Sequence, residues 1–172
     1  MTPAIHEIDE LPIPMPFTPP VAGFAELYER HYEAVFRAAL RVTGNPADAE
    51  DVLQTVFLRA MAGGGDIENV ATPAAYFRRA AVNAAVDVLR RREFRAESDY
   101  EDHAAIQPPF LLRERLRRAL ATLDRDDASL FLLRHVEGLD LDELAGMFDI
   151  TKNNATVRLH RIRLRLQAEM ER

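Results

Sequence analysis

Two helical patterns separated by a short turn occur in LDLDELAGMFDITKNNATVRLHRIRLRL, residues 139–166. Asp140 is a good N-cap residue, and Glu143 follows it at the spacing of a capping box. The second pattern repeats apolar residues at intervals of four, three and four: Ala155, Leu159, Ile162 and Leu166. We therefore predict helices over 141–148 and 152–168, arranged as a helix-turn-helix.

The outer face of the second of these helices carries side chains suited to the DNA major groove. Arginine can bind guanine or phosphate, asparagine can pair with adenine, and valine can contact the methyl group of thymine. The candidate residues on this face and its flanks are Asn153, Asn154, Thr156, Val157, Arg158, His160 and Arg161. The alternative is an ordinary bundle helix with a basic, solvated face.

Helical periodicity also dominates the chain upstream of this stretch. Apolar residues from Phe24 to Leu40 follow the spacing of an amphipathic helix, which Gly44 ends. Asn45 followed by Pro46 marks the start of the next helix. Further helices are predicted at 46–61, 73–95, 111–122 and 125–137. No segment alternates like a strand, so the fold class is all-α.

Proline and charge divide the chain into four parts. Six of the ten prolines lie in the first twenty residues, which predicts a flexible or extended tail. A short acidic stretch that ends at Pro108 and Pro109 is typical of a linker. The expected parts are a tail at 1–20, a helical domain at 21–95, an acidic linker at 96–110 and a second helical domain at 111–172.

The helix predicted at 46–61 has an outer face with mixed chemistry. Its inner stripe is apolar, whereas the outer face holds Asp48, Asp51, Gln54 and Leu58. Acids in the first turn also complement the helix dipole, so a solvated face would explain part of this pattern. An exposed leucine beside acids and an amide favours a surface that contacts another protein.

The helix predicted at 73–95 has one apolar side and one side suited to an unpaired nucleic acid. An aromatic ring can stack on a base, arginine can bind phosphate, and an amide or carboxylate can bind a base edge. The candidates are Tyr76, Arg79, Asn83, Asp87, Arg90 and Arg91. The alternative is a solvated face on which Asp87 pairs with Arg90 or Arg91.

Composition narrows the classes of function. The formal net charge is −6, but residues 73–95 and 151–172 are each net +4, so two separate places could meet phosphate. Cysteine is absent, which excludes thiolate metal sites and cysteine nucleophiles. The five histidines show no metal-ligand spacing and no phosphate-binding loop follows a strand, so we expect no enzyme, no cofactor and no metal. Neither a membrane span nor a signal peptide is visible, which makes the cytoplasm the default location.

The chain as a whole resembles a bacterial extracytoplasmic-function (ECF) sigma factor of the sigma-70 family. Residues 24–44 resemble region 2.1 of that family, and DAEDVLQTVFLR, residues 48–59, is similar to region 2.2. Residues 76–92 resemble regions 2.3 and 2.4, and residues 120–166 resemble region 4.

This resemblance implies partners and roles for the candidate residues. In the family, region 2.2 binds the clamp helices of the largest subunit of core RNA polymerase, which implies that role for Asp48, Asp51, Gln54 and Leu58. Regions 2.3 and 2.4 open and recognise the minus-ten promoter element, and region 4 recognises the minus-thirty-five element and meets the polymerase flap. The resemblance therefore implies minus-ten binding by the candidates of helix 73–95, minus-thirty-five binding by those of helix 152–168, and an anti-sigma factor as a further partner.

Two other classes of protein stay open at this point. A sigma mimic would occupy an anti-sigma factor without binding DNA, but it should lose its DNA-facing cations, which this chain keeps. A helix-turn-helix repressor would need no acidic face on helix 46–61 and would usually dimerise on a palindrome.

Overall fold

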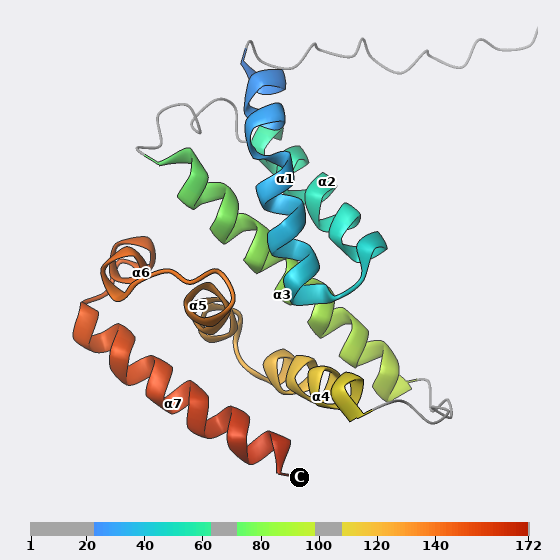
Figure 1. Ribbon diagram of the computed structural model, residues 1–172, viewed down its shortest axis with the longest axis vertical. Helices are drawn as coiled ribbons and strands as arrows, with labels where there is room; N and C mark the ends of the chain where they lie inside the picture. The colour runs from blue at the N-terminus through green and yellow to red at the C-terminus, as the bar shows by residue number, and fades with distance from the viewer. Residues whose placement is uncertain (1–22, 63–71, 99–107, 172) are drawn as a thin grey trace, which may run out of the picture.

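The computed structural model describes residues 23–62, 72–98 and 108–171, and within these ranges the protein is built from helices without strands (Figure 1). The all-α prediction is confirmed. The predicted tail at 1–20 and most of the acidic linker lie outside the described residues. The helices are α1 (Phe24–Thr43), α2 (Pro46–Ala62), α3 (Pro73–Ser98), α4 (Pro108–Thr122), α5 (Arg125–His135), α6 (Leu141–Phe148) and α7 (Lys152–Met170).

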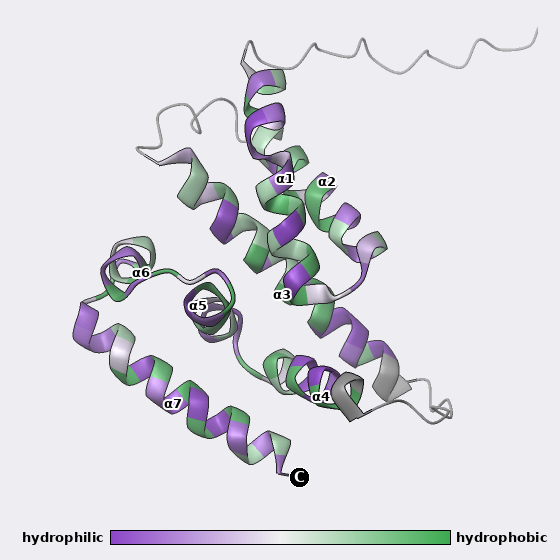
Figure 2. Ribbon diagram, viewed as in Figure 1, coloured by the Kyte–Doolittle hydropathy of each residue, from purple (hydrophilic) through white to green (hydrophobic). Residues whose placement is uncertain are grey.

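Helices α1, α2 and α3 pack against one another as the first half of the molecule. The apolar side predicted for α3 is buried, and near the start of α3 the Phe77 ring contacts the rings of Phe57 and His31 at centroid distances of 5.0 and 4.8 Å. Figure 2 shows the apolar faces of these helices turned toward one another. The outer faces of α2 and α3 are fixed by this packing.

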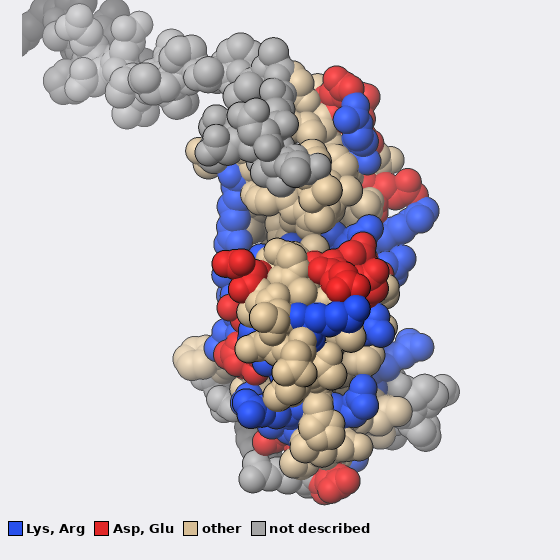
Figure 3. Space-filling view, turned by 90° about the vertical axis from the view of Figure 1, so that its left-hand side faces the viewer, with Lys and Arg blue, Asp and Glu red and all other residues tan. Residues whose placement is uncertain are grey.

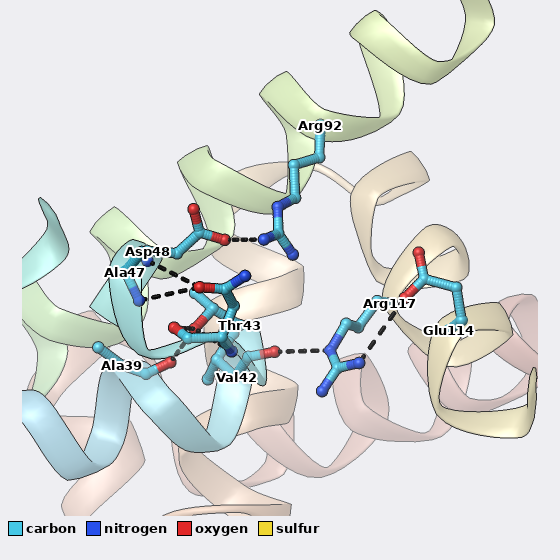
Figure 4. A network of polar contacts seen from close by, with 9 residues as sticks. Ala39, Val42, Thr43, Ala47, Asp48, Arg92, Glu114 and Arg117 are labelled. Carbon is cyan, nitrogen blue, oxygen red and sulfur yellow. Dashed lines mark hydrogen bonds and ion pairs between the residues drawn. The ribbon is translucent and has the colours of Figure 1, made fainter. Parts of the chain in front are cut away.

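The corner between α1 and α2 is held by a polar network (Figure 4). Gly44 ends α1 in the left-handed conformation, at a φ of 66°, which a residue with a side chain rarely adopts. The Asn45 side chain accepts hydrogen bonds from the backbone N–H groups of Ala47 and Asp48 at 2.9 and 3.3 Å, which confirms the predicted cap. Arg117 of α4 donates from Nε to the carbonyl of Val42 at 3.2 Å, so the second half of the chain reaches this corner.

Helices α4 to α7 form the second half, and α6 and α7 make the predicted helix-turn-helix. Asp140 and Glu143 form a complete capping box at the start of α6. The Thr151 hydroxyl accepts from the N–H of Asn154 at 3.1 Å and caps α7. The four residues predicted as the packing stripe of α7 are all buried, so the opposite face is turned to solvent.

Five helix ends differ from the sequence prediction, and those of α2 and α7 differ only by one and two residues, at Ala62 and Met170. Helix α3 continues to Ser98 and α4 begins at Pro108, so helices enter the expected linker from both sides. Helix α5 ends at His135, two residues early, because the N–H groups of Val136 and Glu137 both bond to the carbonyl of Leu132 and close the helix there.

The two halves are in contact along α3. Helix α3 packs against α4 and α5 as well as against α1 and α2. Val82 and Val86, on the flank of α3 next to Arg79, are only 0% and 1% exposed, and the buried core runs continuously through both halves. Helix α3 is therefore buried on more of its circumference than the single apolar side that the sequence indicated.

Candidate nucleic-acid interface

Helix α2 presents three of its four candidate residues to solvent. Asp51 and Gln54 are exposed, and the Leu58 side chain is 62% exposed although it is large and apolar. Asp48 differs, because it is half-buried and forms an ion pair with Arg92 of α3 (Figure 4). The outer face of α2 thus offers Asp51, Gln54 and Leu58, whereas Asp48 ties α2 to α3.

Helix α3 brings its aromatic, arginine and amide candidates to one cavity. Tyr76, Arg79 and Asn83 line a space of about 340 Å³ together with Val56, Arg59, Ala80 and Arg125. Tyr76 stands edge-on to Phe77, with ring centroids 5.4 Å apart, which holds its ring beside the cavity. A stacking ring, an amide and several guanidinium groups around one cavity can hold a base and its phosphate.

The alternative interpretation expected this face of α3 to be solvated. The structure differs, because part of the face contacts α5 and α6. Asp87 accepts from Arg125 of α5 at 2.9 Å rather than from Arg90 or Arg91, both of which are exposed. Arg79 donates to the backbone carbonyl of Met147 in α6, and its guanidinium lies over the Phe148 ring, 4.4 Å from the centroid. These contacts leave Arg79 and Asp87 only half-exposed, and Tyr76 and Asn83 are half-exposed as well.

Two residues at this site were missed from the sequence, Arg59 of α2 and Arg125 of α5. Arg125 carried a usable signal. It is the first residue of α5, directly after the Asp124 cap, where the helix dipole favours acids over cations. A cation at that position suggests a partner outside its own helix.

Helix α7 presents most of its candidate residues to solvent. Asn153, Asn154, Thr156, His160 and Arg161 are exposed, and Val157 is 40% exposed although it is apolar. At the start of α7, the Lys152 ammonium donates to Asp142 of α6 at 2.8 Å. That hydrogen bond and the charge of the carboxylate raise the pKa of Lys152, so this lysine stays charged at the end of α7 that would enter a groove.

Arg158 is the exception among the candidates of α7. Its Nε and one terminal nitrogen both donate to the same Asp127 oxygen of α5, at 3.0 and 2.6 Å, and the pair is mostly buried. Arg165 adds a longer contact to Asp127 at 3.7 Å. Arg158 thus joins α7 to α5, and Arg161 is the arginine of the predicted set that projects freely.

Charge is distributed unevenly over the surface. Figure 3 views the molecule from the side of α6 and α7, where blue basic groups are interrupted by red acidic groups instead of merging into one basic surface. Groups of His, Asp and Glu that could hold a metal ion are absent from the described residues. None of the helices in those ranges combines the length and apolar character of a membrane span.

A helical molecule that carries a helix-turn-helix with an outward-facing second helix is of a class that binds DNA. Residues 27–95 match the family model of sigma-70 region 2, and residues 113–166 match that of sigma-70 region 4. The chain belongs to the sigma-70 family, and within it to the ECF sigma factors. It is a sigma factor, which binds core RNA polymerase and directs promoter-specific transcription initiation.

Curated relatives cover most of the chain. RNA polymerase sigma factor CarQ of Myxococcus xanthus is 30% identical over 146 residues, which span 81% of this chain and 84% of CarQ. RNA polymerase sigma-E factor of Streptomyces coelicolor is 28% identical over 157 residues, 87% of each chain. ECF RNA polymerase sigma factor SigM of Mycobacterium tuberculosis is 27% identical over 147 residues, 84% of this chain and 75% of SigM.

A solved structure shares the fold. The sigma factor RpoE of Bartonella quintana, crystallised with the anti-sigma factor NepR, matches with a TM-score of 0.52 at 20% identity. The match covers 88% of this chain and 98% of that one.

Proposed function

We propose that three helix faces of this sigma factor each bind a different partner surface. The outer face of α2 binds core RNA polymerase through Asp51, Gln54 and Leu58. The face of α3 around the cavity opens and binds the minus-ten element. The outer face of α7 binds the minus-thirty-five element in the major groove. The observation that carries this assignment is the solvent exposure of Asn153, Val157 and Arg161 opposite a fully buried stripe.

The α2 assignment gains support from the exposure of Leu58. Burial of a leucine side chain that is left in water is favourable by about 1.5–3 kcal/mol, so a partner surface gains from covering it. We assign Asp48 to the contact between α2 and α3 instead, because its carboxylate already pairs with Arg92.

For α3, the cavity supports capture of an unpaired base. A base that leaves the stack needs a ring to stack on and polar groups for its edge, and Tyr76 and Asn83 offer both. Arg79 and Arg90 lie on the same side of the helix, Arg91 follows Arg90 in the chain, and the three supply charge for the DNA backbone.

We expect the protein to work in the cytoplasm beside core polymerase and to catalyse no reaction itself. An anti-sigma factor is an expected partner, since the structurally similar RpoE was crystallised with one.

The assignment is tested with two matched pairs of variants. Leu58→Ala should weaken binding to core polymerase about tenfold, whereas Leu112→Ala, an equally exposed leucine on α4, should not. Arg161→Ala should weaken minus-thirty-five binding in the holoenzyme by about 1–3 kcal/mol, whereas Arg163→Ala, on another side of α7, should not. Equal losses within either pair would contradict the faces assigned here.

A further inference from the structure

Helix α1 exposes two neighbouring tyrosines. Tyr28 and Tyr32 are 39% and 45% exposed. Their rings are stacked, with centroids 5.6 Å apart and planes 12° from parallel. The Tyr28 ring also contacts the ring of Phe57 in α2, at a centroid distance of 4.7 Å, which holds it in place. The two rings therefore form one apolar surface that is open to solvent, and it belongs to none of the three faces assigned above.

The charges of α1 indicate which kind of partner suits this surface. All three arginines of the helix are ion-paired, and the helix contains no lysine. The ion pairs are Glu26–Arg30, Glu33–Arg37 and Arg41–Glu137. A nucleic acid or an acidic peptide needs cations that are free to meet its charges, and α1 has none to offer. An uncharged, apolar partner fits the tyrosine pair better.

A segment of that chemistry lies in the chain itself, shortly before α1. Residues 11–20, LPIPMPFTPP, contain no charged residue and alternate apolar side chains with proline from 11 to 17. Such sequences favour the polyproline II conformation, which binds to surfaces lined with aromatic rings because it is already formed and loses little entropy. The proline-rich segment and the tyrosine pair are thus complementary in their chemistry.

The segment is also long enough to reach the tyrosines. Phe17 lies six residues before Gly23, a reach of about 19 Å at about 3.1 Å per residue of polyproline II. Tyr28 and Tyr32 lie about 8 and about 14 Å along α1 from Gly23, at about 1.5 Å per residue. Gly23 has a φ of 102°, which glycine adopts without strain, so the chain can turn back along α1 at this point.

We propose that residues 11–20 fold back onto α1 and bind Tyr28 and Tyr32 as a polyproline II segment. Phe17, the only aromatic residue of the segment, supplies the ring contact. Helix α1 thus carries a binding face for a proline-rich segment, and the tail of the same chain occupies it. This binding does not depend on the DNA and polymerase contacts proposed above.

A single tryptophan can report on this contact. The chain has no tryptophan, so Phe17→Trp introduces one without background. In the full-length variant, we expect tryptophan emission at shorter wavelength than that of N-acetyltryptophanamide, and quenching by acrylamide that is several-fold weaker. Tyr32→Ser in the same background should abolish this protection, whereas Tyr32→Phe, which keeps the ring, should preserve it.

Two further variants test the position and the conformation of the bound segment. Leu111→Ser changes an equally exposed apolar side chain at the start of α4, far from the first half of α1 (Figure 1), and should leave the protection unchanged. Pro14→Gly together with Pro16→Gly disfavours polyproline II and should expose the tryptophan. Circular dichroism should show the same helix content in every variant.

Dilution separates binding within one chain from binding between two copies. Protection that stays constant on dilution supports the proposal, whereas protection that falls on dilution would overturn it in favour of the tail of a second copy. A tryptophan that acrylamide quenches as readily as N-acetyltryptophanamide would also overturn it. Equal protection with Tyr32 and with Tyr32→Ser would overturn the tyrosine pair as the binding face.

Discussion

At the scale of single residues, some of the side chains expected to meet partners pair with other helices of the chain. Asp48 pairs with Arg92, and Arg158 donates twice to Asp127. Helical periodicity predicts which face of its own helix a side chain occupies, and it placed both residues on faces that a partner could reach. It does not predict which neighbouring helix brings an opposite charge to that face, so these two ion pairs could not be predicted from the sequence.

The role of Arg158 leads to a stability prediction. Arg158→Ala should lower the free energy of unfolding by about 1–2 kcal/mol, since it leaves the mostly buried Asp127 carboxylate with only its longer contact to Arg165. Arg161→Ala, which removes an exposed arginine from the same helix, should change it by less than about 0.5 kcal/mol. Urea unfolding of both variants checks this, and equal stabilities would refute the structural role of Arg158.

A second residue-scale prediction concerns pH. Burial, and then the charge of Arg30, lower the pKa of His31 below its ordinary 6.5, and burial also lowers the pKa of His135. A histidine with a lowered pKa in the folded state binds its proton more readily when unfolded, so stability falls as pH drops below about 6.5.

His31→Gln provides the test. The loss of unfolding free energy between pH 7.5 and 5.5 should be smaller in His31→Gln than in the parent, with the His135 contribution remaining in both. Urea unfolding at the two pH values measures it. An identical loss in the variant would show that His31 does not carry this dependence.

At the scale of elements, the helices could be predicted well from local sequence. The Asn45 cap, the Asp140 capping box and the stripe from Ala155 to Leu166 all involve residues within a few positions of one another. Contacts between helices could not be predicted from local sequence. The sequence gives no sign that Val82 and Val86 are covered from a second side, or that Asp87 meets Arg125.

Two glycines in or beside helices should respond oppositely to the same substitution. Gly44 has positive φ, and a Cβ there would overlap the Arg117 guanidinium, so Gly44→Ala should cost about 1 kcal/mol or more. A Cβ at Gly146, within α6, meets nothing, so Gly146→Ala should stabilise by about 0.5–1 kcal/mol. Urea unfolding gives both values, and changes of the same sign would contradict the backbone conformations described.

At the scale of the whole molecule, net charge and the contacts between helices act in the same direction. The acidic remainder of the chain opposes the approach of DNA to the two basic stretches, and α5 and α6 bind Asp87 and Arg79 of the first stretch. Free protein should therefore bind promoter DNA weakly, and core polymerase should be needed for recognition.

We propose that this chain directs core polymerase to promoters through two separate DNA-binding faces. Run-off transcription with core polymerase on templates whose upstream sequence is randomised, followed by sequencing of the starts, measures this. We predict starts that depend on the protein and share two motifs at fixed spacing, and Arg161→Ala should relax the upstream motif alone. Core polymerase that binds the protein yet produces no protein-dependent starts would contradict the claim.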